Sequence, residues 1–331
     1  MKAIFFSNHR DDLQRVYEKS IKARIQTMTG ASPEFYSAED LGRADFSKVK
    51  YLFTTWGMAA LSEAEIKTYF PALECVFYAA GSVQNFARPF LKCGIKVFSS
   101  WKANAVPVIE YALAQIVLAG KGFYPLLQKT KESYEKAAEY QKNFYGNYNT
   151  NIGILGDGAI GGEIIKRLKR DYSVNVFVYS ITMSKERAQE LGVRLSTLEE
   201  IFSNCSVISN HLANNDKTKG IINAALLSKM KPYTTFINTG RGAQIDEEAL
   251  IEVLKKDATI TAVLDVTDPE PPKAGSELYT RPNVFLTPHI AGSSGNEVQR
   301  MAEYMADEAE RYLNGQPLLY EVTESMLEFM A

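Results

Sequence analysis

The sequence predicts an α/β protein made of two domains, each built on a doubly wound parallel sheet. Short apolar runs of strand length alternate with helix-like stretches through residues 2–98, and the same alternation resumes from residue 151 onward. A long apolar stretch at 104–121 separates the two series. The chain has 331 residues, which is enough for two ordinary domains with sizeable cores.

Composition and charge narrow the class of protein. The formal net charge is −2, so the overall charge does not favour binding to nucleic acid or to an anionic membrane surface. Cys75, Cys93 and Cys205 form no C-x-x-C pair and are expected to be reduced, buried residues. The N-terminal apolar run is too short for a signal peptide, and the longest apolar stretch, at 106–120, is too short to span a bilayer. We therefore expect a soluble, cytoplasmic protein.

The first series opens with a strand at 2–6 and a polar helix at 11–24. A second helix, at 62–70, ends before Pro71, which cannot continue it. The other expected strands of this series are short apolar runs, at 51–55, 75–80 and 95–98. Strands that alternate with helices at this spacing predict a parallel sheet with helices packed on it.

Residues 104–148 connect the two series. The stretch 104–121 is expected to form one long apolar helix, and because it contains no flexible linker sequence we interpret it as a rigid connector between domains. The polar and aromatic stretch 123–148 has the composition of an arm that packs on a partner subunit. A solvated helix followed by a loop fits this stretch equally well.

The second series supplies the remaining strands and the C-terminal helix. Its expected strands are apolar runs, at 152–155, 174–179, 207–209, 234–237, 260–264 and 284–286. A charged helix is expected at 297–313, and we expect the tail after it to return to the first domain.

A glycine-rich turn links the first strand of this series to an amphipathic helix and fits the spacing G-x-G-x-x-G. Gly156 permits the tight turn, Gly158 lets a pyrophosphate approach the backbone, and Gly161 lets the helix pack close to the strand. Ala159 and Ile160 begin the helix, whose N-terminal N–H groups and dipole attract phosphates. The turn therefore predicts a dinucleotide site, and a strand-to-helix turn without a ligand is the alternative.

The end of the next strand bears on the choice of dinucleotide. About 20 residues past the glycines a carboxylate normally holds the adenosine ribose, and Ser180 occupies that place. The turn also carries hydroxyls and cations that suit a 2′-phosphate, on Thr182, Ser184, Lys185 and Arg187. This composition favours NADP(H) over NAD(H), unless Lys185 and Arg187 simply begin the next solvated helix.

Polar clusters follow three strands of the second series, at 238–242, 265–271 and 287–292. In open α/β sheets, ligands lie beyond the carboxyl ends of the strands. We therefore expect these three clusters to meet in one crevice.

Arg241, Glu270 and His289 in these clusters form a suitable set for reducing a 2-keto acid. The guanidinium grips the carboxylate and polarises the carbonyl, the imidazole donates the proton to the new hydroxyl, and the carboxylate orients the imidazole. Each of the three has a structural alternative as a surface or turn residue. Of the other histidines, His9 lies in a polar loop without a partner motif, and His211 is assigned at most a positioning role. No metal-binding motif is present, so no metal site is predicted.

Taken together, these motifs resemble the D-isomer-specific 2-hydroxyacid dehydrogenase family. The resemblance covers about residues 75–315 well and rests on four segments, ILGDGAIGGEI (154–164), FINTGRGAQIDEEAL (236–250), AVLDVTDPEPP (262–272) and LTPHIAGSS (286–294). The stretch 104–118 resembles the interdomain helix of the family, and 215–231 also matches.

The resemblance implies a domain organisation and an assembly. A Rossmann cofactor domain, residues 103–295, is inserted in a flavodoxin-like substrate domain made of residues 1–102 and 296–331. Members of the family are usually homodimers joined through the cofactor domains, which agrees with an arm at 123–148.

The resemblance also implies roles for the residues of the cofactor half. Arg241 corresponds to the substrate-binding arginine, and Glu270 to the partner of the acid/base His289. Asp265 corresponds to the aspartate near the nicotinamide carboxamide. Thr239, in the cluster that carries the arginine, is a further candidate cofactor contact.

The candidate substrate contacts lie in the first series. By the resemblance, Gly81, Ser82 and Val83 form the turn whose backbone N–H groups take the substrate carboxylate. Trp56, on the loop after the second strand of the first series, is expected to touch the substrate side chain. The segment 81–86 lacks the acidic residue often found after this turn, so the identity of the substrate does not carry over from the family.

These features predict an NAD(P)H-dependent 2-hydroxyacid dehydrogenase that works as a reductase of small 2-keto acids, of the glyoxylate or hydroxypyruvate type. The alternative from another class is a dinucleotide-sensing protein or corepressor that binds the cofactor without turnover. Retention of Arg241, Glu270 and His289 together favours the enzyme, since a sensor needs none of them.

Overall fold

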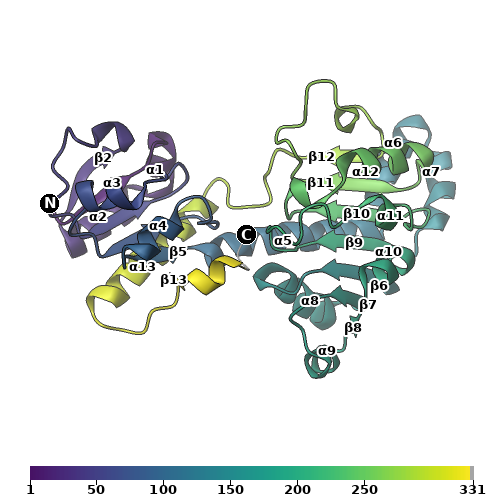
Figure 1. Cartoon of the computed structure of the whole chain (residues 1–331). Coiled ribbons are helices and arrows are strands. Elements are labelled where there is room, and N and C mark those ends of the chain that lie inside the picture. The colour runs from purple at the N-terminus through teal and green to yellow at the C-terminus, as the bar shows by residue number, and fades with distance from the viewer. Residues whose placement is uncertain (329–331) are drawn as a thin grey trace. The chain divides into compact units, whose positions relative to one another are not determined.

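The structure is a computed structural model that describes residues 1–328, and it contains two compact units (Figure 1). Unit 1 comprises Met1–Ala105 and Ser293–Ala331, and unit 2 comprises Val106–Gly292. In the described part of the chain, each unit holds one sheet whose strands are parallel, apart from a short edge strand in unit 1. The α/β class with two parallel sheets, predicted from the sequence, is therefore confirmed.

Unit 1 is built, within the described residues, on a six-stranded sheet in the order β13-β5-β4-β3-β1-β2. Its strands are β1 (Ala3–Phe6), β2 (Ala31–Tyr36), β3 (Tyr51–Thr54), β4 (Cys75–Tyr78), β5 (Lys96–Ser99) and β13 (Glu321–Val322). The parallel strands run β2-β1-β3-β4-β5, which is the flavodoxin-like order. Because β1, β3 and β4 are neighbours, the residues that follow them share one edge of the sheet.

Aromatic side chains fill the core of unit 1. Phe53, Phe77 and Phe98 pair in register across β3, β4 and β5, and their rings stack at centroid distances of 5.0 and 4.9 Å. All three are buried, and stacked aromatic pairs contribute beyond the area that they bury. This row of rings keeps the strands in register and so fixes the ends of β3 and β4, after which Trp56 and Gly81 follow.

The helices of unit 1 differ from the prediction near the N-terminus. They are α1 (Arg10–Val16), α2 (Lys19–Thr29), α3 (Glu63–Tyr69), α4 (Ala87–Lys92) and α13 (Glu297–Leu313), with 3-10 turns η1 (Ala38–Asp40) and η5 (Glu324–Glu328). The single helix predicted at 11–24 is wrong, because Tyr17 leaves the helical conformation and its buried hydroxyl donates to the carbonyl of Thr54 at 3.0 Å. The sequence does not predict the edge strand β2, because Pro33 and Glu34 interrupt its apolar pattern.

The C-terminal segment completes unit 1. Helix α13 packs against β4 and β5, and β13 extends the edge of the sheet antiparallel to β5. The carboxylate of Glu308 is fully buried and accepts hydrogen bonds from the N–H groups of Leu319 and Tyr320 at 2.7 and 2.9 Å. Since a buried carboxylate is costly without such donors, this contact anchors the tail in unit 1.

Unit 2, whose residues are all described, is built on a seven-stranded parallel sheet in the order β12-β11-β10-β9-β6-β7-β8. Its strands are β6 (Tyr148–Leu155), β7 (Ser173–Tyr179), β8 (Arg194–Leu195), β9 (Val207–Asn210), β10 (Thr235–Asn238), β11 (Thr261–Leu264) and β12 (Val284–Leu286). The chain starts at β6, builds outward to β8, and then returns to β9 on the other side of β6. The reversal between β6 and β9 is the switch point at which doubly wound sheets bind ligands.

Helices flank the unit 2 sheet (Figure 1). They are α8 (Ala159–Asp171), α9 (Lys185–Leu191), α10 (Leu198–Asn204), α11 (Ala224–Leu227) and α12 (Glu247–Lys256), with 3-10 turns η3 (Gly242–Gln244) and η4 (Glu277–Tyr279). Helices α10, α11 and α12 bury Phe202, Leu227 and Leu250 in one core cluster with Phe236 of the sheet. Helix α8 packs against β6 and β7.

Helix α5 (Trp101–Gly120) runs through the boundary between the units. It begins earlier than predicted, and its 20 residues make it the one described helix that is long and apolar enough to cross a membrane. The prediction that the apolar stretch here is too short is therefore wrong. Half of its most apolar window is buried inside the protein, and a buried core helix passes the same test of length and composition. That the protein has no contact with a membrane stays a prediction.

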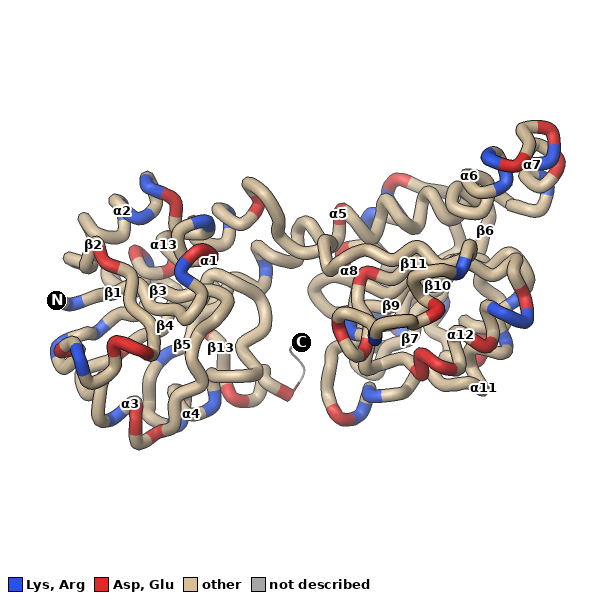
Figure 2. Tube along the Cα trace, turned by 90° about the horizontal axis from the view of Figure 1, so that it is seen from above, with Lys and Arg blue, Asp and Glu red and all other residues tan. Residues whose placement is uncertain are grey.

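Helices α6 (Phe123–Glu132) and α7 (Tyr134–Tyr140), followed by the 3-10 turn η2 (Gln141–Asn143), form the stretch that leads into β6. Figure 2 shows acidic and basic residues close together along α7. The side chains of Tyr134 and Tyr145 are 75% and 80% exposed. Large exposed aromatic rings suit an arm that meets a partner subunit, which stays a prediction.

Candidate active site

The glycine-rich turn follows β6 at the switch point of the unit 2 sheet. Gly156 has a φ of +93°, and a Cβ atom there would lie 2.8 Å from the carbonyl oxygen of His211. A Cβ atom at Gly161 would lie 2.0 Å from the carbonyl oxygen of Gly156, so α8 can pack this closely only on glycine. At Gly158, by contrast, a Cβ atom would have no neighbour within 4 Å. The backbone at Gly158 is therefore open to an approaching group.

Helix α8 begins at this turn, and no side chain caps its N-terminus. Ala159 and Ile160 are its first residues. The uncapped N–H groups and the helix dipole together favour a phosphate group. The open backbone at Gly158 and the uncapped helix fit the pyrophosphate of a dinucleotide.

Two alanine substitutions separate the roles of these glycines. The Cβ atom added by Gly158→Ala has no neighbour within 4 Å, so we expect the free energy of unfolding of this variant to stay within about 1 kcal/mol of wild type. Its affinity for a dinucleotide should fall at least about tenfold, because the methyl group occupies the space that the pyrophosphate approaches. Gly161→Ala overlaps backbone and should lower the free energy of unfolding by about 1–3 kcal/mol. Urea unfolding and calorimetric titration with NAD⁺ and NADP⁺ measure both quantities. A Gly158→Ala variant with wild-type affinity would contradict the assignment of this turn.

The residue at the end of β7, Ser180, is engaged within the protein. Its hydroxyl donates to Oδ1 of Asp157 at 2.5 Å, and the hydroxyl of Thr182 donates to the same atom at 3.1 Å. Sequence reasoning missed Asp157. Its place between the first two glycines of the turn gives no sign that its side chain reaches the end of the next strand.

The remaining polar residues of that turn serve the next helix. Ser184 caps α9 by accepting a hydrogen bond from the N–H of Arg187, and the guanidinium of Arg187 pairs with Glu190 at 2.9 Å. Lys185 is the first residue of α9. Lys185 and Arg187 therefore belong to the next helix, and the preference for NADP(H) stays a prediction.

Asp265 follows β11 and organises the loop after β12. Its buried carboxylate accepts from the hydroxyl of Thr287 at 2.7 Å and from the N–H groups of Ile290 and Ala291 at 2.8 and 2.9 Å. Hydrogen bonds to a carboxylate are stronger than those between neutral groups, so they hold this loop firmly against the end of β11. The position of His289, in the middle of the loop, is therefore set by Asp265.

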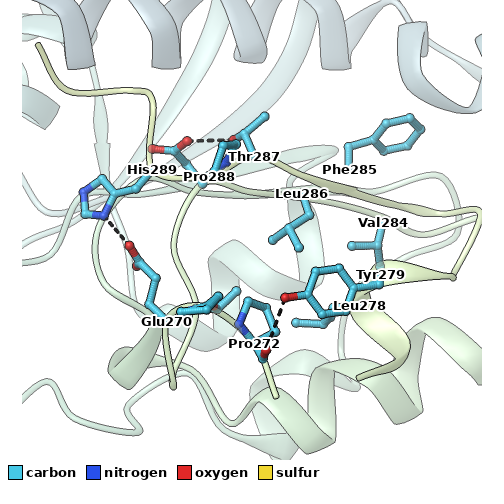
Figure 3. A pocket seen from close by; sticks show the side chains of 13 residues that line it. Glu270, Pro272, Leu278, Tyr279, Val284, Phe285, Leu286, Thr287, Pro288 and His289 are labelled. Atoms are coloured by element: carbon cyan, nitrogen blue, oxygen red, sulfur yellow. Dashed lines mark hydrogen bonds and ion pairs between the residues drawn. The ribbon is translucent and has the colours of Figure 1, made fainter. Parts of the chain in front are cut away.

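His289 and Glu270 contact each other in unit 2. Nδ1 of His289 lies 2.6 Å from Oε1 of Glu270, and the two side chains point toward one another (Figure 3). His289 has a φ of +54°, which is uncommon for a residue other than glycine. A carboxylate on Nδ1 fixes the orientation of the ring and leaves Nε2 available for another partner. The structure thus brings these two predicted residues together, and their catalytic role stays a prediction.

A cavity of about 700 Å³ opens beside this pair. His289 and Glu270 lie at one end of it, and Val284 and Phe285 lie at the other (Figure 3). The wall between them is mostly apolar and includes Leu278. A mostly apolar cavity with a few polar groups at one end is the usual form of a small-molecule site.

Arg241 follows β10, the strand next to β11, and buried amides hold its backbone. Its N–H donates to Oε1 of Gln244 at 3.1 Å, and its carbonyl accepts from Asn238 at 3.2 Å. Asn210 donates to the same oxygen of Gln244 at 2.8 Å. Burial lowers the pKa of Arg241, while the charge of Glu270 acts in the opposite direction. Sequence reasoning missed the amides, because neutral buried side chains resemble any other core residues.

His211 lies between two hydroxyl groups. Its Nε2 is 2.8 Å from the hydroxyl of Ser209, and its Nδ1 is 3.4 Å from that of Thr239. Loss of water around the ring lowers the pKa of His211 to about 3, so the ring is neutral near pH 7. A ring held neutral is poorly suited to exchange protons at that pH, and His211 therefore suits a positioning role beside Thr239.

Acid should destabilise the folded chain through His211. An ordinary histidine has a pKa of about 6.5, whereas the pKa of folded His211 is about 3, so the unfolded chain binds the proton first. The stabilisation is complete above pH ~6.5 and is lost as the pH falls from there toward 3. In this window we expect wild type to lose up to about 1.4 kcal/mol of unfolding free energy per pH unit more than His211→Gln. Urea unfolding at pH 7, 5 and 4 measures both slopes, and equal slopes would contradict a ring that stays neutral in the folded chain.

Unit 1 carries the residues assigned to the substrate. The carbonyl of Trp56, after β3, accepts from the hydroxyl of Ser7 at 2.6 Å. At the adjoining Gly57, a Cβ atom would lie 2.5 Å from the ring of His9. His9, which sequence reasoning discounts, therefore lies at the same edge of the sheet as Trp56. Its place after β1, next to β3 in the sheet order, is the signal that could have found it.

The turn after β4 presents free backbone. The carbonyl of Gly81 accepts a hydrogen bond from the hydroxyl of Ser99 at 2.6 Å, and Val83 is buried. These two contacts hold the turn in place. Among the described residues, none accepts a hydrogen bond from the N–H groups of Gly81, Ser82 or Val83. These N–H groups are available for an anion such as a carboxylate. The roles of this turn and of Trp56 toward a substrate stay predictions.

Comparison with known proteins identifies the relatives of this chain. Residues 113–291 match the family model described as D-isomer specific 2-hydroxyacid dehydrogenase, NAD binding domain. The match covers more than half of the chain and includes the glycine turn, Arg241, Glu270 and His289.

Individual relatives differ in what they act on. A D-3-phosphoglycerate dehydrogenase from Archaeoglobus fulgidus is 30% identical over 244 residues, which are 72% of this chain and 45% of that protein. A glyoxylate reductase from Korarchaeum cryptofilum is 28% identical over 257 residues, which are 77% of each chain. The solved structure of D-mandelate dehydrogenase from Rhodotorula graminis covers 98% of both chains with a TM-score of 0.79 and 19% identity, a likeness of fold. The chain spans less than half the length of the D-3-phosphoglycerate dehydrogenases that it matches.

Proposed function

This chain belongs to the D-isomer-specific 2-hydroxyacid dehydrogenase family, and we propose that it reduces small 2-keto acids. Its NAD-binding domain indicates an oxidoreductase that uses a nicotinamide dinucleotide. The observation that carries the proposal is the 2.6 Å contact of His289 with Glu270, at the edge of the sheet where Arg241 follows β10. The glyoxylate reductase among its relatives supports a keto acid of the glyoxylate or hydroxypyruvate type.

Three side chains perform the proposed reaction. Arg241 presents a rigid fork of donors that matches the carboxylate and carbonyl oxygens of a 2-keto acid. When bound, the reduced nicotinamide supplies a hydride to C2 of the acid. His289 donates the proton on Nε2 to the carbonyl oxygen as the alcohol forms, and accepts it in the reverse direction. Glu270 holds Nδ1, so the exchanged proton is the one on Nε2.

Binding is divided between two sets of residues. In unit 2, the turn 156–161 contacts the pyrophosphate, while Thr239 and Asp265 contact the nicotinamide half of the cofactor. In unit 1, the free N–H groups at 81–83 take the substrate carboxylate, and Trp56 meets the substrate side chain. Each set follows the carboxyl ends of strands in its own sheet.

The two sets correspond to two domains. We assign residues 103–295 to a Rossmann cofactor domain and residues 1–102 with 296–331 to a substrate domain. The strand orders of the two sheets are those of a dinucleotide-binding and a flavodoxin-like fold, which supports the assignment.

The identity of the dinucleotide depends on the surroundings of Ser180. The sequence favours NADP(H) on the ground that this residue is not acidic. The contacts of Ser180 do not support that preference, because its hydroxyl and that of Thr182 already donate to Asp157. The choice between NAD(H) and NADP(H) therefore depends on which charged groups lie beside the ribose position.

We also propose a cytoplasmic homodimer whose partners are small molecules, not nucleic acid or membrane. The exposed rings of Tyr134 and Tyr145 offer apolar surface to the cofactor domain of a second copy. The net charge of −2 gives no attraction to nucleic acid or to anionic lipid.

Nicotinamide absorbance tests the proposed reaction. The purified chain is mixed with NADH or NADPH and, in turn, with glyoxylate, hydroxypyruvate, pyruvate and branched or aromatic 2-keto acids. We expect the dinucleotide to be consumed with a small keto acid. Tight dinucleotide binding without consumption across the panel would favour the sensor or corepressor instead.

A further inference from the structure

Asp157 brings a carboxylate to the end of β7, where Ser180 takes the place of the usual acidic residue. It lies between Gly156 and Gly158, and its Oδ1 accepts hydrogen bonds from the hydroxyls of Ser180 and Thr182 at 2.5 and 3.1 Å. Ser180 marks the end of β7, where a doubly wound dinucleotide fold holds the adenosine ribose. The acidic group at this position therefore comes from the glycine turn instead of from the strand.

The same contacts leave one oxygen of Asp157 for a ligand. A carboxylate has two oxygens that accept about four hydrogen bonds in total. Both hydroxyl donors go to Oδ1, and no described residue donates to Oδ2. A ribose carries hydroxyl donors that suit this second oxygen.

The hydroxyls of Ser180 and Thr182 are poorly placed to bind a phosphate, because they already form hydrogen bonds within the protein. Ser180 also accepts from the N–H groups of Thr182 and Met183, at 3.0 and 2.9 Å, so its oxygen is held in a tight turn. Arg187 is paired with Glu190, which removes one of the two cations that the sequence places near a 2′-phosphate. Lys185 is left as the nearby cation, and it is exposed at the start of α9.

We propose that Asp157 binds the adenosine ribose through its carboxylate and makes the chain select NAD(H) over NADP(H). The inference rests on the proposed function, which supplies the dinucleotide. A 2′-phosphate carries a charge of about −1.5 to −2 near pH 7 and would meet the carboxylate of Asp157 directly. A free 2′-hydroxyl instead donates a charge-assisted hydrogen bond to it. This preference for NAD(H) is opposite to the preference for NADP(H) that Ser180 predicted.

Equilibrium binding to the whole chain tests this role without relying on turnover. Calorimetric titration gives the dissociation constants of NAD⁺ and NADP⁺ for wild type and for Asp157→Asn. We expect wild type to bind NAD⁺ at least about tenfold more tightly than NADP⁺, and Asp157→Asn to bind the two within about threefold. The amide has the same shape and still accepts from Ser180, so urea unfolding should give nearly the same stability.

Two further variants make the test specific. Glu186→Gln removes a negative charge from the start of α9 without touching Ser180, and its NAD⁺/NADP⁺ ratio should equal that of wild type. Ser180→Ala keeps Asp157 and should therefore keep the preference for NAD⁺. A loss of NADP⁺ affinity alone in Ser180→Ala would instead mean that the hydroxyl reads a 2′-phosphate.

The outcomes separate this inference from the proposed function. Wild type that binds NADP⁺ as tightly as NAD⁺ or more tightly, or an unchanged ratio in Asp157→Asn, overturns the role of Asp157 while leaving the dehydrogenase proposal intact. Failure of wild type to bind either dinucleotide overturns the proposed function itself, and with it this inference.

Discussion

His289→Gln should lower kcat by about 10²- to 10⁴-fold while leaving the dissociation constant of the dinucleotide within about twofold of wild type. The imidazole is the group that supplies the proton to the carbonyl oxygen, and a glutamine amide does not exchange protons near pH 7. Binding should persist because the glycine turn lies at the end of β6, far along the sheet from β12. Steady-state rates with a saturating keto acid, together with calorimetric titration of the dinucleotide, measure the two effects.

Two further substitutions, each of a carboxylate by a carboxamide, give values of kcat to compare with that of His289→Gln. Glu270→Gln removes the carboxylate that holds Nδ1 and should give a smaller but clear loss of kcat, because the ring is no longer fixed. Asp268→Asn, two residues away and exposed, is the matched control and should retain wild-type kcat. Wild-type turnover in His289→Gln would remove the histidine from the reaction.

Arg241→Lys should lower kcat/KM for the keto acid by about 10²- to 10³-fold. Lysine keeps the positive charge but replaces a rigid fork of donors by a single mobile ammonium group, which cannot grip a carboxylate and a carbonyl oxygen at once. Because the interaction forms with the substrate, most of the loss should appear as a higher KM, with kcat also reduced. Initial rates over a range of keto acid concentrations separate the two constants.

A surface arginine provides the control for this substitution. Arg194 is 60% exposed and pairs with Glu200, so Arg194→Lys should leave both constants unchanged. Dinucleotide binding to Arg241→Lys should also be unchanged, because the guanidinium is assigned to the substrate. A normal KM in Arg241→Lys would mean that another group binds the carboxylate.

Much of the local geometry follows from the sequence because it depends on spacing along the chain. The three glycines of the turn lie between a buried strand and an amphipathic helix, and this order alone fixes their roles in a doubly wound fold. The placement of Arg241, Glu270 and His289 at one edge of the sheet follows from a simple rule as well. All three come after neighbouring parallel strands, β10, β11 and β12, whose carboxyl ends meet at one edge.

Contacts between distant side chains could not be predicted in this way. Asp157 and Ser180 are 23 residues apart, and the motif spacing says nothing about which way the side chain between two glycines points. The break between α1 and α2 depends on Tyr17, whose hydroxyl finds a carbonyl acceptor on β3. The same limit applies to the contact of His211, which follows β9, with Thr239, which follows β10 and lies 28 residues further along the chain.

A deuterium label tests the central claim most directly. The chain is incubated with glyoxylate or hydroxypyruvate and a reduced dinucleotide that carries deuterium at the transferable position of nicotinamide C4. We expect a 2-hydroxy acid with one deuterium at C2, in the D configuration when the product is chiral, and labelling at least about a hundredfold slower with His289→Gln. Oxidation of the dinucleotide without deuterium in the acid, or binding without oxidation for every keto acid tried, would contradict it.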